Sequence, residues 1–228
     1  MVSPFLCARI NCYFMRTFYR EGKNRMETRA FRAFGRSYRF SAQGQAQYLA
    51  CVADLLATPQ VQSLARYEQH FDINRLQHVL SVSYMAYLIC GKLGGDAALA
   101  ARSGILHDLY YYDWRVKDPR HHLHGIYHPG FSLKNARKLC GVLDPQMENA
   151  ILRHMWPLTL ALPRGRVANA VSLADKYCAF YECVISFSPK FREKFYAALA
   201  RDFPAPTGIS LLASQKPEKD IPEIIDNA

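Results

Sequence analysis

The chain has 228 residues, half of them hydrophobic, and a formal net charge of +10 at pH 7. This length supports one full hydrophobic core and little of a second, so we expect one globular domain with extensions at its ends. No run of about 18 apolar residues is present, which argues against a membrane-spanning helix. The seven cysteines lack the spacing of a zinc ribbon or a disulfide framework. We therefore expect a soluble, cytoplasmic protein with reduced thiols.

The positive charge is concentrated at the N-terminus. Residues 1–40 hold nine Lys and Arg against two Glu, which accounts for +7 of the total charge of +10. We assign residues 1–41 to a basic extension, disordered or partly helical. It is interpreted as a solvated surface, a transit-like segment or an extension upstream of a later start at Met15 or Met26. Contact of this arm with nucleic acid or an anionic surface is the alternative, although no nucleic-acid-binding fold signature accompanies it.

From residue 42 onward the apolar residues recur at helical spacing, and no alternating strand-like run of useful length is found. The pattern predicts an all-α domain over residues 42–203 and a Pro-rich C-terminal tail over 204–228. Asp144 followed by Pro145 is typical of a helix start, and Gly141 of a helix end. The predicted helices cover residues 43–57, 61–69, 74–92, 96–107, 130–140, 145–155, 165–185 and 189–201.

Three ionisable side chains lie on helix faces that are otherwise apolar, namely His78, His154 and Asp175. A lone histidine on such a face is more often a hydrogen-bonded core residue than a metal ligand. A buried carboxylate, however, is costly unless a cation or several donors meet it. His107 and Asp108 are adjacent at the end of another predicted helix. A divalent metal ion would satisfy all of these groups at once.

The order of these polar residues along the chain is also informative. The chain carries, in sequence, His78, the pair His107-Asp108, His128, His154 and Asp175. This order, with the contexts "GILHD" and "SLADK", resembles the HD superfamily of metal-dependent phosphohydrolases from about His78 to Tyr181. The layout is similar to that of small bacterial HD proteins that hydrolyse dinucleoside polyphosphates. The resemblance implies an HD-domain-like helical bundle, here with additional N- and C-terminal helices.

The same resemblance implies a ligand set for metal. Four residues would hold a first ion: His78, His107, Asp108 and Asp175. His128 and His154 would complete a second site that Asp108 bridges. If these two histidines lie far from the others, a mononuclear site with four ligands remains.

The choice of His128 for the second site has rivals in the preceding loop. His121, His122 and His124 precede it, and we expect these three to face solvent. His128 is preferred because it stands at the entry of the helix predicted from residue 130. Nitrogen and oxygen ligands without cysteine suit Fe, Mn, Co, Ni or Zn. The family implies two ions, with iron or manganese favoured.

This chemistry points to a phosphate substrate. Four neutral imidazoles and two carboxylates would leave two divalent ions with net positive charge, which attracts a phosphate ester. Bound metal also lowers the pKa of water toward neutrality. We predict a metal-dependent phosphohydrolase that cleaves a phosphoester or phosphoanhydride of a nucleotide or dinucleoside polyphosphate, with no membrane partner. The alternatives are a di-iron oxygenase on the same ligands and a non-catalytic module that senses a nucleotide.

Several neighbouring residues are candidates for substrate contact. Lys176, beside Asp175, would contact the phosphate and assist Asp108 in catalysis, or else face solvent. Arg75, one turn before His78, would bind substrate or pair with a local carboxylate. Trp156 and the aromatics at residues 110–114 would stack a nucleobase, or pack against the core and loops. Asp113 is a weaker candidate for orienting a water molecule.

Overall fold

The computed structural model describes residues 42–70, 73–116, 118–119 and 123–186, together with Lys190 and Glu193. The predicted basic extension at 1–41 and the tail at 204–228 lie outside the described residues, as does nearly all of the helix predicted at 189–201. His121 and His122 also lie outside them.

The described part of the chain is almost entirely helical, which confirms the all-α prediction. Its helices are α2 (Ala42–Leu56), α3 (Pro59–Gln62), α4 (Arg75–Lys92), α5 (Ala97–Leu106), α6 (His124–Cys140), α7 (Pro145–Arg153) and α8 (Gly165–Ser186). A 3-10 turn, η1 (Ser63–Arg66), and two short strands, β1 (Glu68–His70) and β2 (Ile73–Asn74), connect α3 to α4. The strands pair antiparallel and form a two-stranded sheet.

The predicted helix at 61–69 is wrong in its second half. Thr58 caps α3 by accepting from the amide of Val61, with proline in the first turn, so the helix begins at Pro59. The chain becomes extended at Tyr67, with φ −105° and ψ 124°, and continues into β1. No alternating run announced these strands, because they are only three and two residues long.

The start of α6 also differs from the prediction. The helix begins at His124 rather than at residue 130, and Pro129 lies inside it. Proline removes one intrahelical hydrogen bond and normally signals a helix boundary. Here His124 stacks on the rings of Trp114 and His128. This tertiary packing keeps the first turn helical, so His128 lies one turn inside the helix and not at its entry.

Side-chain caps fix where the other helices begin. Asn74 and Gln77 form a reciprocal capping box at the start of α4, with distances of 2.9 and 3.0 Å between amide nitrogens and side-chain oxygens. Asp96 caps α5, and Asp144 caps α7 as predicted. Gly141, which ends α6, has a φ of +75°. These caps satisfy backbone groups at the helix ends and fix where the helices begin and end.

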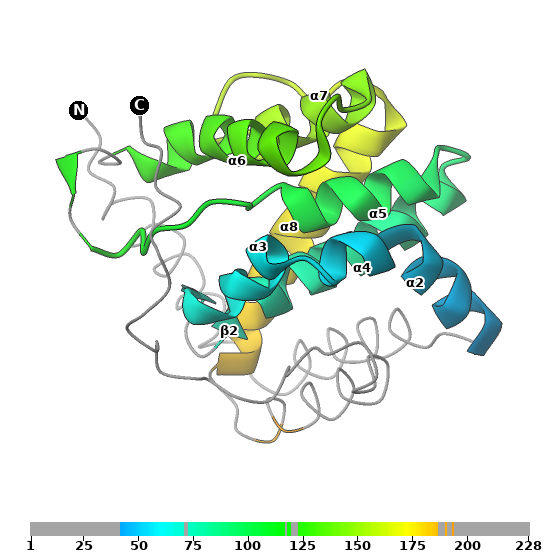
Figure 1. Cartoon of the computed structure of the whole chain (residues 1–228), viewed down its shortest axis with the longest axis horizontal. Helices are drawn as coiled ribbons and strands as arrows, with labels where there is room; N and C mark the ends of the chain where they lie inside the picture. The colour runs from blue at the N-terminus through cyan, green and yellow to red at the C-terminus, as the bar shows by residue number, and fades with distance from the viewer. Residues whose placement is uncertain are drawn as a thin grey trace, which may run out of the picture.

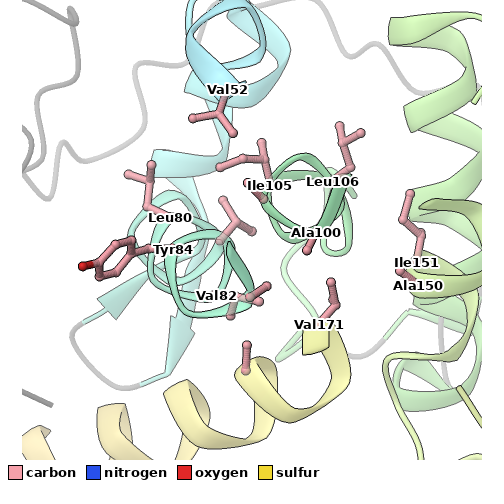
Figure 2. Close-up of a cluster of buried hydrophobic side chains, with 14 of the residues drawn as sticks. Val52, Leu80, Val82, Tyr84, Ala100, Ile105, Leu106, Ala150, Ile151 and Val171 are labelled. Carbon is pink, nitrogen blue, oxygen red and sulfur yellow. The ribbon is translucent and has the colours of Figure 1, made fainter. Parts of the chain in front are cut away.

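Helices α4, α5 and α8 form the centre of the bundle, with α2 on one side and α6 and α7 on the other (Figure 1). Figure 2 shows part of the buried cluster: Leu80 and Val82 lie on different sides of α4, Ile105 lies between α5 and α2, and Val82 and Val171 lie near each other at α8. Helix α5 approaches α4 so closely that a Cβ atom on Gly104 would lie 2.4 Å from the Cα of Ser83. Among the described helices, none is both long and apolar enough to span a membrane.

Candidate metal centre

The six residues singled out by sequence order lie together inside the bundle, although they come from five different helices or helix ends. His78 lies on α4, His107 and Asp108 at the end of α5, His128 on α6, His154 at the end of α7 and Asp175 on α8. All six are buried, and the most accessible of them, Asp175, is only 8 % exposed. His107 is the C-cap residue of α5, and His154 is the C-cap residue of α7.

Asp108 lies between two pairs of histidines. Its Oδ2 is 4.0 Å from Nε2 of His78 and 3.7 Å from Nε2 of His107. Its Oδ1 is 3.1 Å from Nε2 of His128 and 3.6 Å from Nε2 of His154. The two oxygens of one carboxylate therefore face two different pairs of imidazoles. This is the arrangement expected of a carboxylate that bridges two ions.

The orientation of three imidazoles is set by backbone carbonyls. Each ring donates from Nδ1 to a carbonyl of the preceding turn: His107 to Gly104 at 2.8 Å, His128 to His124 at 2.8 Å, and His154 to Ile151 at 2.7 Å. A carbonyl can only accept, so Nδ1 carries the proton and the neutral ring presents a lone pair at Nε2. In all three cases that lone pair points into the cluster.

Several inward-facing atoms lack an ordinary partner. Within the described part of the chain, Nε2 of His78, Nε2 of His107 and Oδ1 of Asp108 are buried without a hydrogen bond. The Nε2 atoms of His128 and His154 lie 2.9 Å apart, with the lone pair of one facing that of the other. Buried polar groups in proteins are normally satisfied. A divalent cation accepts electron pairs from all of these atoms, so the donor set fits metal ions.

The electrostatics agree with this arrangement at His107, His154 and Asp108 and differ at His78. Burial lowers the pKa of His78, but the carboxylates of Glu182 and Asp175 outweigh it and hold this pKa well above its ordinary value, so a metal ion at Nε2 would displace a proton. Burial, together with the neighbouring imidazoles of His107 and His128, lowers the pKa of His154 to about 3, and burial also lowers the pKa of His107. Burial alone would raise the pKa of Asp108, but the surrounding imidazoles hold it well below the ordinary value. Neutral imidazoles beside ionised carboxylates are the protonation states that metal ligands require.

Asp175 and Lys176 lie on the α8 side of the cluster. Oδ1 of Asp175 is 3.3 Å from Nε2 of His78 and 3.8 Å from Nε2 of His107. Nζ of Lys176 is 3.0 Å from Oδ2 of Asp175 and also donates to the carbonyl of His154. The side chain of Lys176 is 38 % exposed, so this residue contacts both the cluster and solvent.

Arg75, which the sequence offered as a contact for substrate or a local carboxylate, lies inside the protein. Its guanidinium is fully buried and donates to Gln69 Oε1 at 2.9 Å and to the carbonyls of Tyr110 and Tyr112 at 2.7 and 3.1 Å. It also stacks on the ring of Tyr110, at 3.6 Å from the centroid. Arg75 has no exposed surface and is linked to the cluster through Gln69, which donates to Asp108.

The other candidates for substrate contact also have defined surroundings. Trp156 is 41 % exposed, two residues after His154. Asp113 pairs with Arg115 at 2.7 Å. His124 was expected to face solvent, but it is half-buried. Its ring stacks on that of His128 with 4.4 Å between the centroids, and its Nδ1 forms a hydrogen bond of 2.9 Å with the hydroxyl of Tyr112.

Three residues beside the cluster were not found from the sequence. Gln69 donates to Oδ2 of Asp108 at 2.6 Å, while Glu182 accepts from Nδ1 of His78 at 2.9 Å. His70, on β1, lies 4.0 Å from Glu182. Glu182 follows Asp175 by two helical turns, so extending the stripe of α8 would have found it. Nothing in the sequence marks Gln69, because β1 is only three residues long and gives no periodic signal.

Comparison with known proteins gives a consistent but partial result. A family model described as HD domain matches residues 75–179, just under half of the chain. Ribonuclease Y of Helicobacter hepaticus is 50% identical over 44 residues, which are 19% of this chain and 8% of that protein. Ribonuclease Y of Helicobacter pylori and of Sulfurimonas denitrificans are 52% and 43% identical over matches of the same length and coverage. The match thus spans less than a tenth of these relatives. No solved structure matches the chain.

Proposed function

Residues 75–179 of this chain belong to the HD domain family, and from this premise we propose that the protein is a metal-dependent phosphohydrolase. The bond cleaved is a phosphoester or phosphoanhydride of a nucleotide or dinucleoside polyphosphate. One observation carries the proposal furthest. Two buried Nε2 lone pairs, on His128 and His154, lie 2.9 Å apart beside a carboxylate oxygen of Asp108, an arrangement that a cation stabilises.

Two ions fit the ligand set better than one. Oδ2 of Asp108, with His78, His107 and Asp175, would hold the first ion. Oδ1 of Asp108, with His128 and His154, would hold the second. The absence of thiolate among the ligands favours iron or manganese over ions that prefer sulfur. Bound there, the ions would supply a water molecule of lowered pKa and positive charge for the phosphoryl oxygens.

The protein side chains then have distinct tasks. Asp108 fixes the relative position of the two halves of the site, because its two oxygens serve both. Lys176 is held beside the site by Asp175 and the carbonyl of His154, and its exposed part is available to a phosphoryl oxygen. Three aromatic rings, Trp114, His124 and His128, stack in a row that ends at the proposed ligand. Such a row offers a planar base a surface beside the reacting phosphate.

A phosphodiester in RNA is the second candidate substrate. The observation in its favour is the similarity to Ribonuclease Y proteins, whose name states an action on RNA. Because the similarity covers only 44 residues, it supports the type of chemistry more strongly than the identity of the substrate.

The test uses the purified full chain. Its metal content is measured by elemental analysis. Product release is then followed over nucleotides, dinucleoside polyphosphates and a short RNA, with chelator and with added manganese or iron. We expect turnover that chelator removes and metal restores. An oxygen electrode run in parallel reports the oxygenase alternative, which would consume oxygen, require iron and fail with manganese.

Variants connect this activity to the cluster. Asp108→Ala is expected to lose both turnover and bound metal while retaining helical content. Asp54→Ala, which removes an exposed carboxylate on α2, is the matched control and should keep both. Full activity in Asp108→Ala would overturn the proposal. His128→Ala should lower the number of bound ions, and an unchanged number would refute the second site.

A further inference from the structure

Glu182 is a buried carboxylate beside the proposed metal centre. It lies on α8, is 1 % exposed, and its two oxygens are 2.9 and 3.0 Å from Nδ1 of His78. Nε2 of His70 also lies 4.0 Å from Glu182, and the side chain of His70 is 29 % exposed. An ionised carboxylate is costly to bury unless hydrogen-bond donors or a cation meet it.

His78 therefore differs from the other three histidines of the cluster. Their Nδ1 atoms donate to neutral backbone carbonyls, whereas that of His78 donates to a carboxylate. A carboxylate that accepts from one ring nitrogen fixes the tautomer and the ring orientation, and it makes the other nitrogen a stronger electron-pair donor. That other nitrogen, Nε2 of His78, lies 3.3 Å from Oδ1 of Asp175 and faces the cluster.

We propose that Glu182 is a positioning residue that holds His78 with its proton on Nδ1 and thereby strengthens the binding of metal at Nε2. This inference rests on the proposed function, because it requires that His78 bind metal. Glu182 contacts Nδ1 of His78, on the side of the ring opposite Nε2, so it acts through this ring. Removing its charge should weaken metal binding and leave the fold intact.

The distances also allow a second arrangement, in which Glu182 itself binds a metal ion. His70, His78 and Glu182 offer ligand atoms within 4.8 Å of one another, close enough for an ion of their own. Two contacts of 2.9 and 3.0 Å between Glu182 and Nδ1 of His78 are ordinary hydrogen-bond lengths, which favours the positioning role. His70→Ala separates the two: a positioning role for Glu182 survives this substitution, and an ion held by His70 does not.

The experiment measures metal affinity rather than turnover. Cobalt(II) binding to the full chain is followed by visible absorption and equilibrium dialysis in Glu182→Gln, a substitution that keeps shape and removes charge. We expect a loss of affinity of about 10- to 100-fold. Glu148→Gln, which removes the carboxylate of a surface pair with Arg137, is the matched control and should bind like the wild type. Circular dichroism of the metal-free proteins checks that both variants fold.

A second background tests whether Glu182 acts through His78. In His78→Ala, adding Glu182→Gln should cause no further loss of affinity. An equal loss with and without His78, a change of less than twofold in Glu182→Gln, or the disappearance of its effect in His70→Ala would each overturn the inference. A wild-type chain that binds no metal at all would overturn both this inference and the proposed function, whereas the other outcomes concern Glu182 alone.

A measurement on the unmutated chain complements the variants. Nitrogen-15 spectra of the zinc-loaded protein, labelled at histidine, should show His78 protonated at Nδ1 and bound to metal through Nε2. Binding of metal through Nδ1, or a proton on Nε2, would refute the inference even if Glu182→Gln failed to fold.

Discussion

Gly104 is the position where the close approach of two helices can be tested most directly. A Cβ atom there would lie 2.4 Å from Cα and 2.7 Å from the amide nitrogen of Ser83, where ordinary contacts are 3.4–4 Å. Both atoms belong to the backbone of α4, so no side chain can rotate away. The substitution Gly104→Ala therefore requires α5 to move from α4 by about 1 Å, a shift of the size that overpacking forces on a core.

The magnitude follows from two opposing effects. Overpacking of this kind costs about 1–3 kcal/mol, and the contact is tight enough to place Gly104→Ala at the upper end. Replacing glycine by alanine inside a helix returns about 1 kcal/mol. We expect a net loss of about 2 kcal/mol in the free energy of unfolding, which for a chain of this size lowers Tm by about 4–8 °C. His107 donates to the carbonyl of Gly104, so metal affinity should fall as well.

Urea unfolding of the metal-free protein measures the first effect, and cobalt titration the second. Gly130→Ala is the control, since Gly130 also lies inside a helix but a Cβ there meets no atom within 4 Å. It should gain up to about 1 kcal/mol. If Gly104→Ala stabilises the protein as Gly130→Ala does, the helices are not in contact at this point and the reasoning fails.

Two further substitutions test the surroundings. Arg75→Met leaves the carbonyls of Tyr110 and Tyr112 without their donor, so we expect a loss of about 3 kcal/mol in urea unfolding without substrate; unchanged stability with a raised KM would instead return Arg75 to a substrate contact. Arg102 bonds to Asp54 and holds the pKa of that carboxyl below its usual value. The pair should therefore contribute about 0.2–1 kcal/mol above the unfolded pKa near 4 and lose it as the pH falls below that value. Asp54→Asn should accordingly be less stable than the wild type at pH 7, and this gap should narrow as the pH falls below about 4 and through the lowered pKa of the folded state; a gap that does not change with pH would contradict the assignment.

The convergence of the cluster was predictable because its members obey helical spacing. His78 and Asp175 lie on apolar stripes of long helices, and a polar group on such a stripe must face the core. His154 ends its helix on the same face as Met147 and Ile151, and His107 directly follows the apolar residue Leu106, so these side chains also turn inward. The order of ligands along the chain then supplied the family, and the HD domain match at residues 75–179 confirmed it.

What the sequence could not supply depends on contacts between distant segments. The start of α6 was predicted wrongly because Pro129 indicates a helix boundary in the sequence. The stacking of His124 on Trp114 is a tertiary contact, and no local sequence pattern records it. The same stacking explains why His124 does not face solvent. Gln69 and Arg75 form a linked pair behind Asp108, but the pairing exists only once β1 has folded against the bundle. Their connection to Asp108 is visible only in three dimensions.

The proposed ligands come from five helices spread over almost a hundred residues, from His78 on α4 to Asp175 on α8. With ions bound as proposed, each would clamp together segments that the bare chain holds only by packing, and the folded state would gain free energy in step with the metal concentration. About 2.7 kcal/mol is gained when the free ion stands at a hundred times its dissociation constant. At a low concentration of that ion, a larger fraction of the protein would unfold and be degraded by proteases. The amount of folded protein, and not only its activity, would then depend on the supply of metal.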